Sequence, residues 1–328
     1  MKTLILDSRK AKDIERAATL LKAGELVALP TETVYGLAAD ASNPEAVAKI
    51  FAAKQRPTDH PLITHIGDLA KLKNWVKQVP DWVYPLAEKF WPGPLTLIFE
   101  RGEHVSDVIT GGLPTIGIRI PDHPLLLSLL KQYNLAVAAP SANPYQKLSP
   151  TTAEHVLAGL DGKIAAVVDG GPCQVGTEST ILRISEHRAE ILRSGPLAAA
   201  DLQPFVKVPI STPLAHQQAV SGNKKIHYQP NAKVVICSSD EITHRVAQSD
   251  TNTAVLLYGQ GVSDEGRDKL SCRVVKNMPV DHHGYRKALY AALYELDIIG
   301  VQEILIETPP KEESWNDIWD RLSRAAAS

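Results

Sequence analysis

The chain has 328 residues, of which 44% are apolar and 22% charged, and its formal net charge is −2. This length allows two domains with buried cores, and the balanced charge argues against a general attraction to nucleic acid or to an anionic membrane. Three cysteines without metal-type spacing argue against a disulfide framework, and no apolar run reaches the length of a membrane span. We therefore expect a cytoplasmic protein without a membrane segment.

The first two hundred residues alternate between short apolar runs and segments of helical periodicity. Gly24 stands where a glycine ends a helix, and Asn43 followed by Pro44 gives the cap and the first-turn proline that open another. This alternation predicts an α/β domain built on an open twisted sheet. Strands are expected at residues 3–6, 26–29, 61–66, 95–99, 116–120, 135–139, 164–169, 179–184 and 189–193, and helices at 14–21, 44–54, 81–90 and 124–132.

Residues 30–37 are the stretch around which this domain is organised. They follow the strand at 26–29 and bring Thr31, Glu32 and Thr33 together behind a proline. In open α/β sheets, ligands bind outside the carboxyl ends of the strands, so we interpret this turn as part of a ligand crevice. The alternative is that these side chains only satisfy backbone groups of the turn itself, which is common for threonine.

Cations follow at the end of the next helix. Lys54 and Arg56 suit a carboxylate or a phosphate, although cations at the carbonyl end of a helix also stabilise the helix itself. His65 and Arg119 stand within predicted strands, where a charged side chain needs a partner or a ligand. The acids nearest the crevice lie on separate loops, and the sequence does not identify a metal site.

Polar residues also follow the strand predicted at 135–139. Ser141 and Asn143 come directly after it, where they either contact a ligand or form side-chain turns. Ser149 precedes Pro150 and is predicted as the N-cap of the next helix, whose N-terminus suits a phosphate. No Ser/His/Asp or Cys/His constellation stands out, so we expect catalysis by positioning and charge stabilisation.

The remainder of the chain predicts a second domain. We expect the first domain to span residues 1–205 and a linker to span 206–230, because that stretch has several prolines and little apolar periodicity. Residues 231–328 alternate again and predict a smaller Rossmann-like doubly wound domain. It lacks a Gly-x-Gly-x-x-Gly or Walker loop, so we assign no cofactor to it. Strands are expected at 232–237, 253–258, 272–276 and 303–307, and helices at 283–299 and 315–326.

Eight short motifs stand in order in the first domain. They are Pro30-Thr31-Glu32-Thr33-Val34-Tyr35-Gly36-Leu37, Lys54-Gln55-Arg56-Pro57, Pro61-Leu62-Ile63 with His65, Trp91-Pro92-Gly93-Pro94-Leu95-Thr96, Arg119-Ile120-Pro121, Ala139-Pro140-Ser141-Ala142-Asn143, Glu178-Ser179-Thr180-Ile181 and Leu192-Arg193-Ser194-Gly195. Together they resemble the YrdC-type threonylcarbamoyl-AMP synthases. The C-terminal extension, with Lys225-Ile226-His227-Tyr228-Gln229-Pro230, is similar to the long, two-domain form of that family.

The resemblance implies an activity and a set of site residues. Members of the family make threonylcarbamoyl-AMP and pyrophosphate from L-threonine, bicarbonate and ATP, for the threonylcarbamoyladenosine next to the anticodon of tRNA. Lys54 and Arg56 are the implied catalytic residues. The implied threonine-binding residues are Thr33, His65, Arg119, Ala139 through its backbone, and Ser179. The implied ATP-binding residues are Lys54, Arg56, His60, Thr115, Ser141, Asn143, Ser149, Arg193 and Tyr228.

The resemblance also implies a nucleotidyltransferase that uses ATP as substrate and magnesium as the neutralising ion. It implies a downstream tRNA threonylcarbamoyl-transfer complex as a partner, a weak contact with tRNA, and a linker that brings Tyr228 to the nucleotide as a lid. Two departures stand out. His60 replaces the usual asparagine, and residues 221–225 replace the usual Pro-Gly-Met followed by basic and aromatic residues.

Two other functions are compatible with such a fold. One is an RNA-binding or regulatory protein that keeps the fold without the chemistry, which the near-neutral charge disfavours. The other is carbamoyl transfer in metalloenzyme maturation, which is disfavoured because the sequence shows no acylphosphatase or zinc-finger segment.

Overall fold

The computed structural model describes residues 2–212, 220, 226–248, 252–259 and 272–327. The chain forms two compact units. The first comprises Met1–Tyr145, Ser149–Gln174 and Glu178–Asn223, and the second comprises Gln146–Leu148, Val175–Thr177 and Lys224–Ser328. Residues 213–219 and 221–225 of the predicted linker lie outside the described residues, so the linker stays a prediction.

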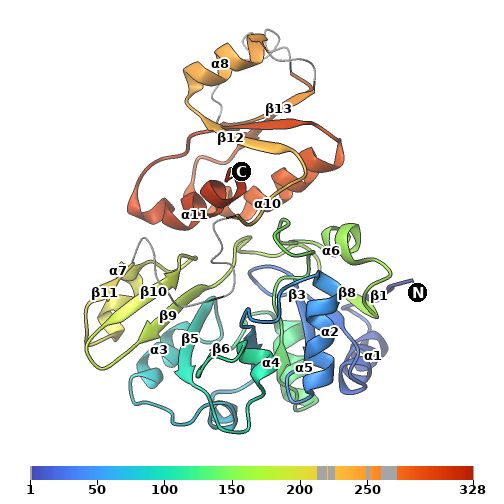
Figure 1. Ribbon diagram of the computed structural model, residues 1–328, viewed down its shortest axis with the longest axis vertical. Coiled ribbons are helices and arrows are strands. Elements are labelled where there is room, and N and C mark those ends of the chain that lie inside the picture. Colours follow the sequence, from blue (N-terminus) through green and yellow to red (C-terminus); the bar gives the residue numbers. More distant parts are fainter. Residues whose placement is uncertain (1, 213–219, 221–225, 249–251, 260–271, 328) are drawn as a thin grey trace. The chain divides into compact units, whose positions relative to one another are not determined.

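A mixed eleven-stranded sheet is the centre of the described part of the first unit (Figure 1). Its strand order is β1-β8-β2-β3-β7-β4-β6-β5-β9-β10-β11, and it contains both parallel and antiparallel pairs. The predicted α/β class is therefore confirmed. The strands are β1 (Leu4–Asp7), β2 (Val27–Leu29), β3 (Gly36–Asp40), β4 (Ile63–His65), β5 (Leu95–Glu100), β6 (Thr115–Arg119), β7 (Val137–Ala138), β8 (Ala166–Asp169), β9 (Thr180–Ile184), β10 (Ala189–Arg193) and β11 (Ile210–Ser211).

Helices cover both faces of this sheet, with apolar clusters between the layers (Figure 1). On one face, α1 (Ala11–Lys22) and α5 (Pro124–Gln132) pack onto β1, β8, β2, β3 and β7. On the other face, α2 (Pro44–Lys54), α3 (Val83–Phe90) and α6 (Ala153–Leu160) pack onto the sheet. Shorter helices are η1 (Leu69–Asn74), α4 (Asp107–Thr110), α7 (Ala199–Leu202) and η2 (Gln203–Phe205).

Local sequence signals account for most of these boundaries. The Asn43 side chain accepts hydrogen bonds from the backbone of the first turn of α2, and Gly24 adopts a φ of 76° directly after the C-cap of α1. The predicted N-cap at Ser149 is wrong. The helix begins at Ala153, and its N-cap is Thr152, whose side chain accepts from the N–H of His155, whereas the hydroxyl of Ser149 donates to Glu178.

The second unit contains a smaller sheet. Its four strands are all parallel and follow the order β12-β15-β13-β14, with an apolar cluster against α8. The predicted second α/β domain is confirmed in this respect. None of the described helices is long and apolar enough to span a membrane. The elements are β12 (Lys233–Cys237), α8 (Ser239–Gln248), β13 (Thr253–Tyr258), β14 (Val274–Met278), α10 (His282–Ile298), β15 (Glu303–Glu307), η3 (Glu313–Trp315) and α11 (Asn316–Ala325).

Candidate active site

One face of the large sheet carries a row of side chains that runs across neighbouring strands, from Val137 through His65, Arg119 and Thr96 to Ile181. His65 is the register partner of both Arg119 and Val137, and Thr96 pairs with Ile181 on β9. Thr96 also lies one step beyond the Leu97–Ile118 pair, so it stands opposite Arg119. Residues directly opposite each other in a sheet share a face. The row therefore lies on the same face as α1 and α5, which pack onto β1, β8, β2, β3 and β7.

Arg119 connects this row to the turn after β2. Its Nη1 donates to Thr33 Oγ1 over 3.0 Å, its Nε donates to the carbonyl of Gly93 over 3.1 Å, and its Nη2 lies 2.5 Å from Glu32 Oε1. All of these side chains are buried. Thr33 and Arg119, which the resemblance assigns to the same binding site, are thus in contact, although they are 86 positions apart in the sequence.

The hydroxyls of the turn have different tasks. Thr31 Oγ1 donates to the carbonyl of Val34 over 2.7 Å and accepts from the backbone N–H groups of Thr33 and Val34. A hydroxyl has one proton, so the 2.8 Å contact between the two threonines is donated by Thr33 to Thr31. Thr31 therefore forms hydrogen bonds with backbone groups of the turn, which is the alternative explanation for these threonines, whereas Thr33 contacts Arg119.

His65 is a neutral member of the row. Its side chain is buried, and burial together with the nearby Arg119 guanidinium lowers the pKa of His65 from 6.5 to about 3. The imidazole is therefore uncharged at neutral pH and is suited to hydrogen bonding rather than to ion pairing.

The stability of the protein is expected to depend on pH through His65. The unfolded chain binds a proton at this residue below pH 6.5, whereas the folded chain binds it only near pH 3, so the free energy of unfolding falls as the pH decreases through this interval. The loss is about 2 kcal/mol at pH 5. Urea titrations at pH 7 and pH 5 should show a smaller decrease for His65→Gln than for the wild type. Equal decreases would contradict the buried neutral state.

Ser179 closes the row at β9. Its hydroxyl lies 2.7 Å from Thr96 Oγ1, and Arg193 Nη2 donates to the same hydroxyl over 3.0 Å and to the Ser179 carbonyl over 2.9 Å. On the other side of the row, the N–H of Ala139 donates to the carbonyl of Ile63 over 3.0 Å, which fixes Ala139 beside β4. The structure thus brings all five predicted threonine-binding residues to one sheet face.

Gly195 is the residue that lets the backbone of Ser179 come this close. A Cβ at Gly195 would stand 2.3 Å from the Thr180 nitrogen and 2.7 Å from the Ser179 carbonyl carbon, and main-chain atoms cannot move aside cheaply. We expect Gly195→Ala to cost about 2 kcal/mol of stability and to weaken threonine use. Thermal denaturation and initial rates measure both effects. Gly102→Ala is the control, because a Cβ at Gly102 would first meet the side chain of His104, at 3.1 Å, and a side chain can move aside. An equal loss in the control would contradict the argument.

A second cluster forms at the amino-terminal ends of β4 and β6. Lys54 is buried at the end of α2, and its Nζ donates to the carbonyls of Ser141 and Asn143 over 2.6 and 2.5 Å. Burial and the neighbouring Arg56 guanidinium lower the pKa of Lys54 well below its ordinary value. The two hydrogen bonds from this amine fix the loop after β7.

The remaining residues of this cluster surround Lys54. Arg56 is also buried, and its Nη2 donates to the carbonyl of Pro61 over 3.1 Å. His60 Nδ1 lies 3.3 Å from the Tyr145 hydroxyl, and the N–H of Tyr145 donates to the Lys54 carbonyl. Thr115 begins β6 at the same end. Pro61, whose carbonyl Arg56 contacts, precedes β4, and His65 is its last residue, so the two clusters lie at opposite ends of this strand.

The other predicted ATP residues lie in two places. Ser149 donates to Glu178 Oε1 over 2.5 Å, and Arg193 holds Ser179, so both lie beside the threonine row. Tyr228 belongs to the second unit, where its ring lies 5.7 Å from that of Tyr290. Its predicted role at the nucleotide stays a prediction. Sequence reasoning assigned no role to Thr96, Tyr145 or Glu178, and it treated Glu32 only as an acid near the crevice.

One expectation about the location of the crevice is wrong. The prediction placed the crevice outside the carboxyl ends of the strands, but β4 and β7 are antiparallel. The carboxyl end of β4, with His65, and that of β7, followed by Ser141, therefore lie at opposite edges of the sheet. The predicted threonine-binding residues lie along the face of the sheet, and the cluster around Lys54 lies at the edge where β4 begins.

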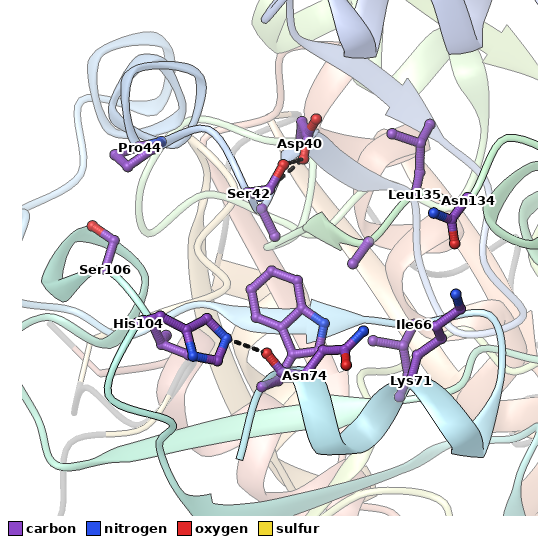
Figure 2. A pocket seen from close by; sticks show the side chains of 14 residues that line it. Asp40, Ser42, Pro44, Ile66, Lys71, Asn74, His104, Ser106, Asn134 and Leu135 are labelled. Atoms are coloured by element: carbon purple, nitrogen blue, oxygen red, sulfur yellow. Dashed lines mark hydrogen bonds between the residues drawn. The ribbon is translucent and has the colours of Figure 1, made fainter. Parts of the chain in front are cut away.

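A separate pocket does open at the carboxyl ends of β3 and β4 (Figure 2). It encloses about 370 Å³ and is lined in part by Asp40, Lys71, Asn74 and His104. None of the predicted threonine or ATP residues lines it. Ser42 donates to Asp40, and His104 contacts the backbone of Asn74, so these polar groups already bond within the protein.

Metal ligation finds little support in the described part of the chain. Those residues contain no group of three or more histidine, cysteine, aspartate or glutamate side chains that could hold an ion. Glu32 is paired with Arg119, and Glu178 accepts from Ser149. Magnesium bound to a nucleotide is held largely by phosphates and water, but the described residues do not form a protein cage for it.

The fold and the site define a two-unit α/β protein with a basic, hydroxyl-lined sheet face. A family profile described as Telomere recombination matches residues 19–195, and one described as Threonylcarbamoyl-AMP synthase, C-terminal domain, matches residues 190–327. The chain belongs to the Sua5, YciO and YrdC family, in its long two-domain form, which confirms the resemblance seen in the motifs.

Individual relatives are similar to this chain over nearly its whole length. The Threonylcarbamoyl-AMP synthase of Bacillus subtilis is 39% identical over 324 residues, which cover 95% of this chain and 92% of the relative. The Pyrococcus abyssi synthase is 34% identical and covers 99% of this chain and 98% of its own. The crystal structure of P. abyssi Sua5 complexed with L-threonine superimposes with a TM-score of 0.88 at 32% identity, over 99% of this chain and 98% of the other.

Proposed function

We propose that this protein synthesises L-threonylcarbamoyl-AMP and pyrophosphate from L-threonine, bicarbonate and ATP, for the threonylcarbamoyladenosine of tRNA. The observation that carries the proposal is the convergence of Thr33, His65, Arg119 and Ser179 on one sheet face, in a fold that matches an L-threonine-bound relative over 99% of the chain. No observation favours an RNA-binding or regulatory function over this enzyme.

The row on the sheet face binds the amino acid. Arg119 takes the carboxylate with its remaining N–H groups, and Thr33, held in place by Arg119, orients the substrate. Neutral His65 and the hydroxyl of Ser179 hydrogen-bond the polar groups of threonine, and the backbone of Ala139 completes the site. These groups are buried, and hydrogen bonds within the protein hold Thr33, Arg119 and Ser179, so these three are positioned before the substrate arrives.

The cluster around Lys54 receives the triphosphate. Arg56 supplies fixed positive charge and Lys54 a second basic amine, while the remaining contacts with the nucleotide come from His60, Thr115, Ser141, Asn143, Ser149 and Arg193. The threonine amine attacks the carbon of bicarbonate, so that a C–N bond forms and water leaves. An oxygen of the resulting carbamate attacks the α-phosphorus, and the bond to the β-phosphate breaks to release pyrophosphate. The cations stabilise charge that develops on the leaving group.

This reaction makes the protein a nucleotidyltransferase. Magnesium enters with ATP and neutralises phosphate charge, and no step is assigned to it because the described residues form no cage for it. Tyr228 and the linker at 206–230 belong to the ATP site in this proposal. The product passes to a tRNA threonylcarbamoyl-transfer complex, the protein touches tRNA only weakly, and the reaction takes place in the cytoplasm.

Pyrophosphate release tests the function directly. The purified protein is incubated with ATP, magnesium and bicarbonate, with and without L-threonine, and the adenylate is identified by mass spectrometry. We expect release only when L-threonine is present. Release that is independent of threonine would overturn the proposal. A steep, salt-sensitive affinity for RNA without adenylate formation would favour the RNA-binding alternative.

A further inference from the structure

Glu32 is a buried acid in the threonine region without an assigned role. It lies in the turn between β2 and β3 and is 7% exposed. Its Oε1 lies 2.5 Å from Arg119 Nη2, and neither carboxylate oxygen accepts a hydrogen bond of good geometry. Burying a carboxylate is costly unless a partner compensates it, so the ion pair with Arg119 needs a functional or structural reason.

The contacts of Arg119 show what this pair does to the guanidinium. Nε and Nη2 form one edge of the arginine fork, and here that edge faces the Gly93 carbonyl and Glu32. Nη1 donates to Thr33, which lies on the outer edge. A guanidinium has five N–H groups, so one remains on each of Nη1 and Nη2 after these contacts. The two remaining groups define the direction in which Arg119 can bind a carboxylate.

The groups that face Glu32 leave the pair with Arg119 undisturbed. His123 and Cys173 both interact electrostatically with Glu32. Burial lowers the pKa of His123 and raises the pKa of Cys173 to about 12, so both are neutral at pH 7. Arg119 is therefore the charged partner of Glu32 that the described residues provide.

We propose that Glu32 is a positioning residue, which holds the guanidinium of Arg119 in the direction of the threonine carboxylate without touching the substrate itself. The proposal rests on the proposed function, because it names the use of Arg119. It predicts that changing Glu32 alters the KM for L-threonine and leaves the KM for ATP nearly unchanged.

Four proteins test this role: the wild type, Glu32→Gln, Glu32→Asp and the control Glu190→Gln. Glu190 is also a buried acid paired with an arginine, Arg183, but it lies on β10 away from the row. We expect Glu32→Gln to raise the KM for L-threonine about 10- to 100-fold, with the KM for ATP within about twofold of the wild type. Glu32→Asp keeps the charge and should lie between the two. Glu190→Gln should change neither KM.

Two results would overturn the role. One is an unchanged KM for threonine, and the other is an equal rise in both KM values, which indicates a general structural effect. If Glu32→Gln does not fold, Glu32→Asp gives the same comparison with a smaller rise. Calorimetric titration with L-threonine alone measures its affinity for the wild type and for each variant without turnover, and the affinity should fall in the same order. Intact threonine binding in an inactive wild type would overturn the proposed function and leave the role of Glu32 to be decided by this titration.

Discussion

Replacing Lys54 by methionine is expected to reduce kcat/KM for ATP about 100- to 1,000-fold. The change removes a buried amine from the end of α2 and leaves the carbonyls of Ser141 and Asn143 without this donor. Both effects act on the phosphate end of the site, because the same loop carries two predicted ATP residues. The measurement is the initial rate of threonine-dependent pyrophosphate release at several ATP concentrations.

Lys49→Met provides the matched control for this change. Lys49 lies on the same helix, but its side chain is about half exposed and bonds to Gly24 and Glu25. Surface pairs of this kind contribute little to stability, so the control should remain active and folded. Lys54→Met activity similar to that of Lys49→Met would contradict a catalytic role for Lys54.

Replacing Arg119 by methionine is expected to abolish threonine use and to destabilise the first unit. The change leaves the Glu32 carboxylate buried without its ion-pair partner, which costs about 3–5 kcal/mol. For a unit of this size the denaturation temperature should fall by about 6 to 12 °C. Thermal denaturation and pyrophosphate release measure the two effects independently.

A double variant separates stability from chemistry. In Glu32→Gln/Arg119→Met the uncompensated charge is gone, so the denaturation temperature should recover most of the loss. Activity should not recover, because the double variant still lacks the guanidinium that binds the carboxylate. A double variant as unstable as Arg119→Met alone would show that the pair does not account for the destabilisation.

The sequence predicted the regular elements well where their periodicity was strong. The helix at 44–54 was placed from its cap, its first-turn proline and its apolar face, and the structure has it at Pro44–Lys54. The strand β3 was missed. Its Gly-Leu-Ala-Ala-Asp sequence has little β preference, and pairing with β2 and β7 supplies what the local sequence lacks.

Single motifs predicted only part of the site. Thr33, Lys54 and Ser141 each had an ordinary structural explanation, and their order along the chain made them informative only as a resemblance to a family. The contacts among them join residues far apart, such as Lys54 with Ser141, and local sequence does not encode such pairs. The role of Glu32 had no sequence signal beyond its position in a motif.

The sequence by itself determined the α/β class, the presence of a second α/β unit, the family and the kinds of side chain at the site. The tertiary structure decided where those side chains meet. Their meeting place depends on the antiparallel pairing of β4 with β7 and on the part of the sheet that α1 and α5 leave uncovered. Strand direction and helix cover follow from long-range packing, which the periodicity of one segment does not specify.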